Sequence, residues 1–108
     1  MAREHLERLG YRLVARNHRT RLGEIDLIMR TDATLIFVEV KTRRSRYSDA
    51  PWDSLHEQKR RQVRRLASAF LSECRLSQSP RNLRFDAIGI LLDCQGRLIR
   101  LDHIENAF

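Results

Sequence analysis

The chain has 108 residues and a mass of 12.8 kDa, which is the size of one domain and excludes a multidomain enzyme. Its 42% hydrophobic and 32% charged residues, with only 4 Gly and 2 Pro, are typical of a globular chain with a buried core. A net charge of +7 and an isoelectric point near 10.6 favour an anionic partner. We therefore expect a single basic domain over residues 1–108.

The sequence also indicates where the protein works. No apolar run approaches the roughly 18 residues that span a bilayer, and the first residues do not lead into a signal-peptide-like stretch. Cys74 and Cys94 have neither C-x-x-C spacing nor clustered histidines, which disfavours a disulfide framework or a zinc site. We expect a cytoplasmic protein with reduced thiols and no membrane contact.

The first predicted elements are a short helix and three strands. Ala2, Leu6 and Leu9 have helical spacing, and Gly10 is a suitable stop before a strand over residues 11–17. Residues 24–30 alternate in polarity and residues 34–41 are rich in β-branched and aromatic side chains, so both predict strands. The link between these two strands is short enough for a hairpin.

The second half predicts a loop, a long helix and two more strands. Residues 43–53 have no period and predict the loop, while Ser54 and Glu57 have the spacing of a capping box for a helix that runs to about Cys74. The nearly continuous apolar run at residues 83–92 predicts a strand buried on both faces. A turn at Gln95-Gly96 and a strand at residues 98–101 follow. The order α-β-β-β-α-β-β predicts an α/β layer structure with one long helix crossing over a mixed sheet.

Three residues form the main candidate for chemistry. Residues two apart on a strand share a face, so Glu39 and Lys41 project together. Asp26 can lie opposite that end of the strand if the two strands pair as a hairpin. Two carboxylates with water and phosphate oxygens suit Mg²⁺, and a lysine there can orient water or stabilise negative charge. The alternative is a cross-strand salt bridge on a solvated sheet face.

The scarcity of lysine supports special roles for Lys41 and Lys59. Of 21 basic residues 19 are arginine, and lysine differs from arginine in being a compact point charge. Lys59 lies four residues from both Leu55 and Val63, which places it on the apolar face of the predicted helix. It either meets an acidic or phosphate partner there or extends its ammonium to solvent at the edge of the core.

Nearly all of the charge excess falls between Lys41 and Arg65, where nine basic and three acidic residues give a net +6. Such a segment is either a solvated helix face or a contact surface for nucleic-acid phosphates. By contrast, we interpret Asp86 as a structural partner of an arginine, and the four histidines show no metal-site spacing. The residues assigned to nucleic-acid binding are Arg43, Arg44, Arg46, Arg60, Arg61 and Arg64.

Five ordered sequence blocks resemble a known family. They are GEIDLI at 23–28, FVEVKTR at 37–43, Lys59-Arg60-Arg61, Arg84-Phe85-Asp86 and HIENAF at 103–108. Together they resemble the YraN-like bacterial proteins, an uncharacterised family, over essentially the whole chain. Such proteins look like members of the PD-(D/E)xK superfamily, to which archaeal Holliday junction resolvases belong. The resemblance implies a restriction-endonuclease-like (tRNA-endonuclease-like) three-layer fold, with a central mixed sheet flanked by helices.

The same resemblance implies roles for individual residues. By position, Asp26 and Glu39 would be metal carboxylates, Val40 a backbone carbonyl ligand, and Lys41 the catalytic lysine, with Lys59 as the basic residue of the following helix. The implied cofactor is Mg²⁺ or Mn²⁺. One departure concerns the first helix, because matching its end to the family pattern places the acidic residue of that helix before Met1. Among the residues present, Glu4 or Glu7 would substitute only if the helix were shifted, so we expect a truncated first helix.

The resemblance thus implies a metal-dependent nuclease-like protein that binds DNA and cleaves phosphodiesters in the manner of a resolvase. The alternative is a nucleic-acid-binding module of the same fold without catalytic turnover, since a fold does not fix an activity. A homodimer is a further expectation, because resolvase-like relatives act on two-fold symmetric substrates.

Overall fold

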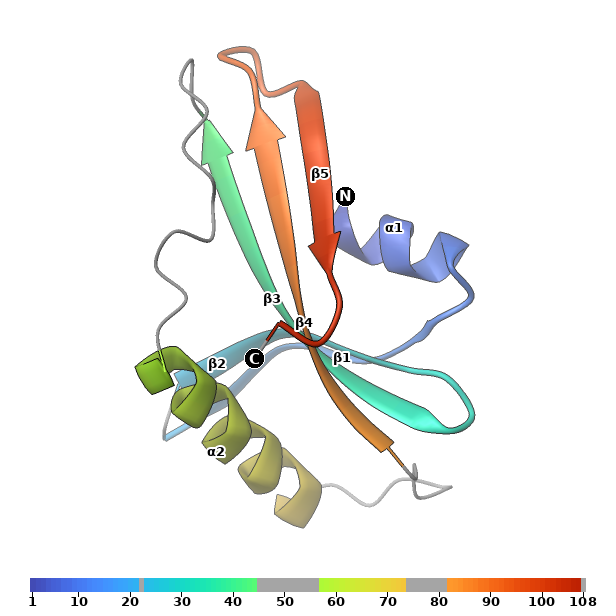
Figure 1. The fold of residues 1–108 in the computed structure, drawn as a ribbon, viewed down its shortest axis with the longest axis vertical. Helices are drawn as coiled ribbons and strands as arrows, with labels where there is room; N and C mark the ends of the chain where they lie inside the picture. Colours follow the sequence, from blue (N-terminus) through green and yellow to red (C-terminus); the bar gives the residue numbers. More distant parts are fainter. Residues whose placement is uncertain (22, 45–56, 74–81, 108) are drawn as a thin grey trace.

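The computed structural model describes residues 1–21, 23–44, 57–73 and 82–107, with the side chains of residues 61–72 described in the second helix (Figure 1). The elements follow the predicted order: α1 (Ala2–Arg8), β1 (Arg12–Thr20), β2 (Gly23–Arg30), β3 (Thr34–Arg44), α2 (Glu57–Glu73), β4 (Asn82–Leu92) and β5 (Leu98–Ile104).

The strands form one sheet in the order β1-β2-β3-β4-β5. Neighbours are antiparallel except for β3 and β4, which pair in parallel from Thr34 with Asn82 to Arg44 with Leu92. A parallel pair needs a long connection between its strands, and α2 supplies it. The predicted mixed sheet with one helical crossover is confirmed.

The two helices cover opposite faces of this sheet (Figure 1). On one face Phe37 and Phe85 pack with Phe70 of α2. On the other face Leu6 of α1 packs in a second core that includes Ile36 and Val38 of β3. The result is the expected three-layer α/β arrangement, which is consistent with a restriction-endonuclease-like fold.

Strand β4 runs through the middle of both cores. Phe85 and Ala87 belong to the α2-side core, whereas Ile88 and Ile90 belong to the α1-side core. The burial predicted from the nearly continuous apolar run at residues 83–92 is confirmed from Phe85 to Leu92, whereas Leu83 is exposed and Arg84 is half-buried.

The end of β3 differs from the prediction. A loop was expected from residue 43 onward, but Arg43 and Arg44 continue the strand because they pair with Leu91 and Leu92 of β4. Their partners lie almost fifty residues away, so the local sequence carries no signal for this extension. Residues 45–53 of the predicted loop, the Ser54 cap and Cys74 lie outside the described residues.

Two of the predicted turns are confirmed. Gly10 ends α1 with a φ of 91°. The turn between β4 and β5 is closed by Asp93, whose Oδ1 accepts hydrogen bonds of 2.8 Å from the N–H groups of both Gln95 and Arg97. Neither helix, over the residues that the structure describes, has the length and apolar character needed to cross a membrane.

Candidate functional site

Asp26 lies where strands β2 and β3 stop pairing. Their ladder ends with Leu27 opposite Val38, so Asp26 is the first residue of β2 beyond it. The Asp26 Oδ2 atom accepts a hydrogen bond of 2.8 Å from the backbone N–H of Val40. A side-chain oxygen therefore takes the place of a backbone acceptor. This hydrogen bond holds the Asp26 carboxylate against the Glu39-Val40-Lys41 segment, as expected from the hairpin.

Glu39 and Lys41 share one face of β3. Leu35 and Phe37 belong to the core under α2, whereas Val40 packs against the core on the α1 side. Because side chains alternate along a strand, Glu39 and Lys41 continue the row of Leu35 and Phe37 toward the α2 side. Both are half-buried, and both take part in further interactions.

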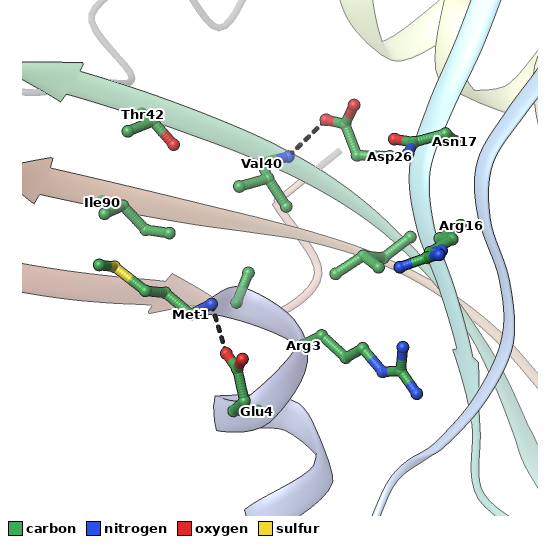
Figure 2. A pocket seen from close by; sticks show the side chains of 11 residues that line it. Met1, Arg3, Glu4, Arg16, Asn17, Asp26, Val40, Thr42 and Ile90 are labelled. Atoms are coloured by element: carbon green, nitrogen blue, oxygen red, sulfur yellow. Dashed lines mark hydrogen bonds and ion pairs between the residues drawn. The ribbon is translucent and has the colours of Figure 1, made fainter.

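A pocket of about 610 Å³ opens beside Asp26 on the α1 side (Figure 2). It is lined by Met1, Ala2, Arg3, Glu4, Arg16, Asn17, Asp26, Leu27, Val40, Thr42 and Ile90. The pocket thus brings together α1, the middle of β1 and β2, the second half of β3, and Ile90 of β4. Glu39 and Lys41 do not line it, since their side chains lie on the other side of the strand.

The first helix contributes an acidic residue to this pocket. Glu4 lines it and pairs with the amino group of Met1. Glu7 points elsewhere and pairs with Arg3 at 3.3 Å. Of the two glutamates considered as substitutes in the first helix, Glu4 is therefore the one that lines the same pocket as Asp26.

The donor set at the β2–β3 end is compatible with a hard divalent cation. Mg²⁺ is typically held by one or two carboxylates, with water and substrate oxygens filling the other positions. Asp26 and Glu39 offer such carboxylates on adjacent strands. Within the described part of the chain, no group of three or more His, Cys, Asp or Glu residues is placed to hold a metal ion. The metal roles of Asp26, Glu39 and the Val40 carbonyl stay predictions.

Lys59 falls in the first turn of α2, and its side chain lies outside the description. Its position is one helical turn before Val63 and two turns before Leu66, both of which are buried. The placement of Lys59 on the covered face of the helix stays a prediction. Its proposed role in catalysis stays a prediction.

The basic residues form two separate groups rather than one surface. Arg43 and Arg44 stand at the carboxyl end of β3, which points away from α2 in Figure 1. Arg61 and Arg64 lie exposed on α2, where the Arg64 guanidinium also stacks 5.0 Å from the centre of the Phe85 ring. Arg46 and the side chain of Arg60 lie outside the described set.

Sequence reasoning missed Arg16 and Asn17. They are consecutive residues of β1, yet both line the pocket, although neighbours on a regular strand face opposite sides. The backbone is irregular at Asn17, whose φ of 49° lies in the left-handed region. Asparagine is enriched in this conformation, which costs roughly 1 kcal/mol for residues other than glycine. An asparagine inside a predicted strand was the sequence signal that could have indicated this irregular backbone.

Asp86 is confirmed as the partner of an arginine. Its fully buried carboxylate accepts two hydrogen bonds of 2.8 Å from Arg84, and a third of 3.0 Å from the backbone N–H of Asn106. Arg84 also donates to the hydroxyl of Tyr11 at 2.8 Å. Burial alone would raise the pKa of Asp86, but the hydrogen bonds from Arg84, Asn106 and His103 outweigh it and hold the pKa below its ordinary value.

The Arg84–Asp86 unit extends to two histidines that the sequence left unconnected. A ring nitrogen of His103 lies 2.8 Å from Asp86, and the other lies 3.2 Å from the Nε2 atom of His5. This row of polar groups lies on the α1 side of the sheet and connects α1 with β4 and β5. It explains Arg84 and Asp86 as structural residues.

Comparisons with known proteins agree on one family. The profile of the family described as "Uncharacterised protein family UPF0102" matches residues 1–90. A UPF0102 protein of Alkaliphilus oremlandii is 39% identical over 108 residues, which covers 100% of this chain and 91% of that protein. One from Symbiobacterium thermophilum is 46% identical over 99% of this chain and 88% of its own length. A third, from Geobacter sulfurreducens, is 42% identical over 100% of this chain and 82% of its own length.

Proposed function

Because the chain belongs to the uncharacterised protein family UPF0102, which is the YraN-like family suggested by its sequence blocks, we propose its function from the chemistry of its site. We propose a metal-dependent nuclease-like protein that binds DNA and cleaves phosphodiesters, with Mg²⁺ or Mn²⁺ as the cofactor. The observation that carries this proposal is the Asp26 carboxylate, which lies at the edge of a pocket and accepts a hydrogen bond from the N–H of Val40, the residue between Glu39 and Lys41.

Each residue has a defined task in this proposal. Asp26 and Glu39 would hold the cation, whose charge makes water a better nucleophile and neutralises phosphate oxygens. The Lys41 ammonium would stabilise the negative charge that develops on the phosphate during attack. Hydrogen bonding to Val40 restrains the Asp26 carboxylate, so it need not be ordered again when the cation binds. Lys59 would add a second positive charge from α2.

The proposed partner is DNA, contacted through phosphates by the two basic groups. Arg43 and Arg44 extend one end of the sheet, and Arg61 and Arg64 are exposed on α2. Separate positive groups suit a partner that runs across the molecule, since each phosphate contact adds affinity by releasing counterions. A cytoplasmic location and a homodimer are parts of the same proposal, and light scattering at several concentrations would test the dimer.

A second candidate is a nucleic-acid-binding module of the same fold without turnover. The absence of a three-ligand group among the described residues favours it, because cleavage needs a more complete metal geometry than binding does. In that case the arginines would still contact phosphates, whereas Asp26 would act only in holding β2 to β3.

The deciding experiment measures Mn²⁺ binding by calorimetry and DNA cleavage in the same preparations. Asp26→Asn keeps an oxygen that can accept from Val40, and Glu39→Gln keeps the length of its side chain. Both should lose most Mn²⁺ binding while remaining folded. Asp32→Asn is the control, since Asp32 is exposed and pairs with Arg12 on the hairpin. Equal metal binding by all four proteins would reject a metal site at Asp26 and Glu39.

Lys41→Arg separates chemistry from binding. Arginine keeps the charge but not the compact ammonium, so cleavage should fall by on the order of 10²-fold while DNA affinity barely changes. The substrates to compare are four-way junctions, flaps and single strands. DNA binding without cleavage of any of these substrates in Mg²⁺ or Mn²⁺ would favour the binding module over the nuclease. A lack of DNA binding at low salt would reject both candidates.

A further inference from the structure

Strand β1 contains a costly backbone conformation directly across from Asp26. Arg16 pairs with Leu27 and His18 pairs with Ile25, so Asn17 lies opposite Asp26 in the same register. The φ of Asn17 is 49°, a left-handed value inside a strand. Strained residues of this kind persist where the surrounding structure holds them, and they are frequent at functional sites.

Two polar side chains at this irregular position line the pocket. Arg16 and Asn17 would face opposite sides of a regular strand, but both line the cavity that Asp26 lines. Figure 2 shows Asn17 beside Asp26, with the Arg16 side chain on the same wall. A neutral amide and a guanidinium are therefore presented together at the candidate site.

The fold itself does not use the side chain of Asn17. This side chain is exposed, and among the residues that the structure describes it takes part in no hydrogen bond or ion pair. If the backbone alone mattered, glycine would adopt the same φ without strain. The amide is thus left available to a molecule that enters the pocket.

We propose that Asn17 and Arg16 form a subsite for one phosphodiester of the bound nucleic-acid strand. Both donate N–H groups, and the Arg16 fork matches the geometry of phosphate oxygens. The Asp26 and Glu4 carboxylates of the pocket repel a phosphate. The Arg16 guanidinium and the Asn17 amide, which line the same pocket, offset this repulsion by attracting the phosphate oxygens. This inference rests on the proposed function and extends it by naming where the strand backbone is held.

Asn17→Gly is the test variant, because glycine keeps the left-handed backbone and removes only the amide. Asn106→Gly is the matched control. Asn106 has a φ of 56°, lies outside the pocket and uses its backbone N–H, which glycine retains, to bind Asp86. Arg16→Gln serves as a second test variant that removes the charge and leaves a shorter polar side chain.

Two measurements are made, the first on every protein and the second on the proteins that retain Asn17. The first is the affinity for a fluorescent single-stranded oligodeoxynucleotide at fixed low salt. The second is a titration with dimethyl phosphate, followed through the side-chain amide resonances of Asn17. We expect Asn17→Gly to bind the oligonucleotide about tenfold more weakly with unchanged thermal stability, as one hydrogen bond to a charged group is lost. Asn106→Gly should bind as tightly as the parent protein.

The outcomes separate the subsite from the general function. If the parent protein binds DNA but Asn17→Gly and Arg16→Gln bind equally well, the subsite is overturned and the proposed function stands. If the Asn17 amide resonances do not move with dimethyl phosphate, the subsite is likewise overturned. If the parent protein binds no DNA, the proposed function fails and the subsite fails with it.

Discussion

The Nε2 atom of His5 lies 3.2 Å from the Nδ1 atom of His103, although the two residues are 98 positions apart. The other ring nitrogen of His103 lies 2.8 Å from the carboxylate of Asp86. Because an ionised carboxylate only accepts, the His103 Nε2–H must donate to it, and a neutral His103 then accepts from His5 at Nδ1.

Acidification should therefore weaken the folded state through His5. Burial lowers the pKa of His5, and the nearby His103 and Arg8 lower it further. A histidine with a depressed folded pKa contributes stability that is present above its unfolded pKa of about 6.5 and lost as pH falls through the folded value. Urea unfolding between pH 8 and pH 5 should show a lower midpoint at the acidic end.

His5→Gln is the variant that checks this pH dependence. Its amide can still donate to His103 but does not titrate, so its stability should fall less between pH 7 and pH 5 than that of the parent protein. Equal pH profiles for the two proteins would show that another group causes the acid sensitivity.

Removing the Asp86 carboxylate should be severely destabilising. Asp86→Ala leaves Arg84, His103 and the Asn106 N–H without their acceptor in a buried site, which we expect to cost about 3 kcal/mol of unfolding free energy. The control is Asp102→Ala. Asp102 pairs with Arg100 at 2.9 Å on the surface, so its loss should cost below about 1 kcal/mol. Similar losses in chemical denaturation would contradict the structural role of Asp86.

The depressed pKa of Asp86 leads us to expect a second loss of stability at lower pH. Its folded pKa is depressed, so its contribution is complete above the unfolded value of about 3.9 and disappears as pH falls further. This window lies below that of His5. A plot of unfolding free energy against pH should therefore fall in two steps, and the lower step should be absent from Asp86→Ala wherever that variant remains folded.

We expect glycine to be needed at position 23 because of its positive φ, not because a Cβ would lack room there. Its φ is 137°, and a Cβ there would lie 3.1 Å from the Nε2 atom of Gln62, which is the movable end of a side chain. Gly23→Ala should thus cost about 1–2 kcal/mol, similar to Gly10→Ala, where φ is 91° and a Cβ would meet nothing within 4 Å. In a double-mutant cycle, Gln62→Ala should not recover the loss. Recovery would instead identify the contact with α2 as the cause.

The salt dependence of DNA binding tests the basic surface of α2. If about four to six phosphates are engaged, the slope of log affinity against log salt should lie at roughly −3 to −6. Replacing Arg60, Arg61 and Arg64 by alanine should flatten that slope by up to about 3. Arg12→Ala is the control, because the Arg12 guanidinium is paired with Asp32 at 2.8 Å. A slope unchanged by the triple substitution would exclude this face of α2 from the contact.

Local patterns were sufficient to predict most of the fold. Alternating polarity in β2, β-branched residues in β3 and the apolar run of β4 depend on nearest neighbours in sequence, and these strands were found. The added length of β3 depends on pairing with β4, which no local window contains. The same limit applies to His5 and His103, which become neighbours only after the sheet has formed.

The candidate site was predicted in part for a related reason. The contact of Asp26 with the Glu39-Val40-Lys41 segment follows from hairpin pairing and strand period, both of which are readable in sequence. The pocket beside it was not predicted. Its lining comes from the first helix and four strands, and residue type restricts the irregular φ of Asn17 on one of them without fixing it.

The parallel pairing of β3 with β4 has a consequence for the order of folding. Every residue that lines the pocket, except Ile90, lies between Met1 and Thr42. Strands β1, β2 and β3 are consecutive and antiparallel, so their contacts close short loops, whereas β3 meets β4 only after the chain of α2 has been spanned. Short loops close with a smaller loss of chain entropy and therefore form sooner. Most residues that line the candidate site thus belong to a segment of low contact order that is synthesised before β4 and β5. These later strands then complete the sheet.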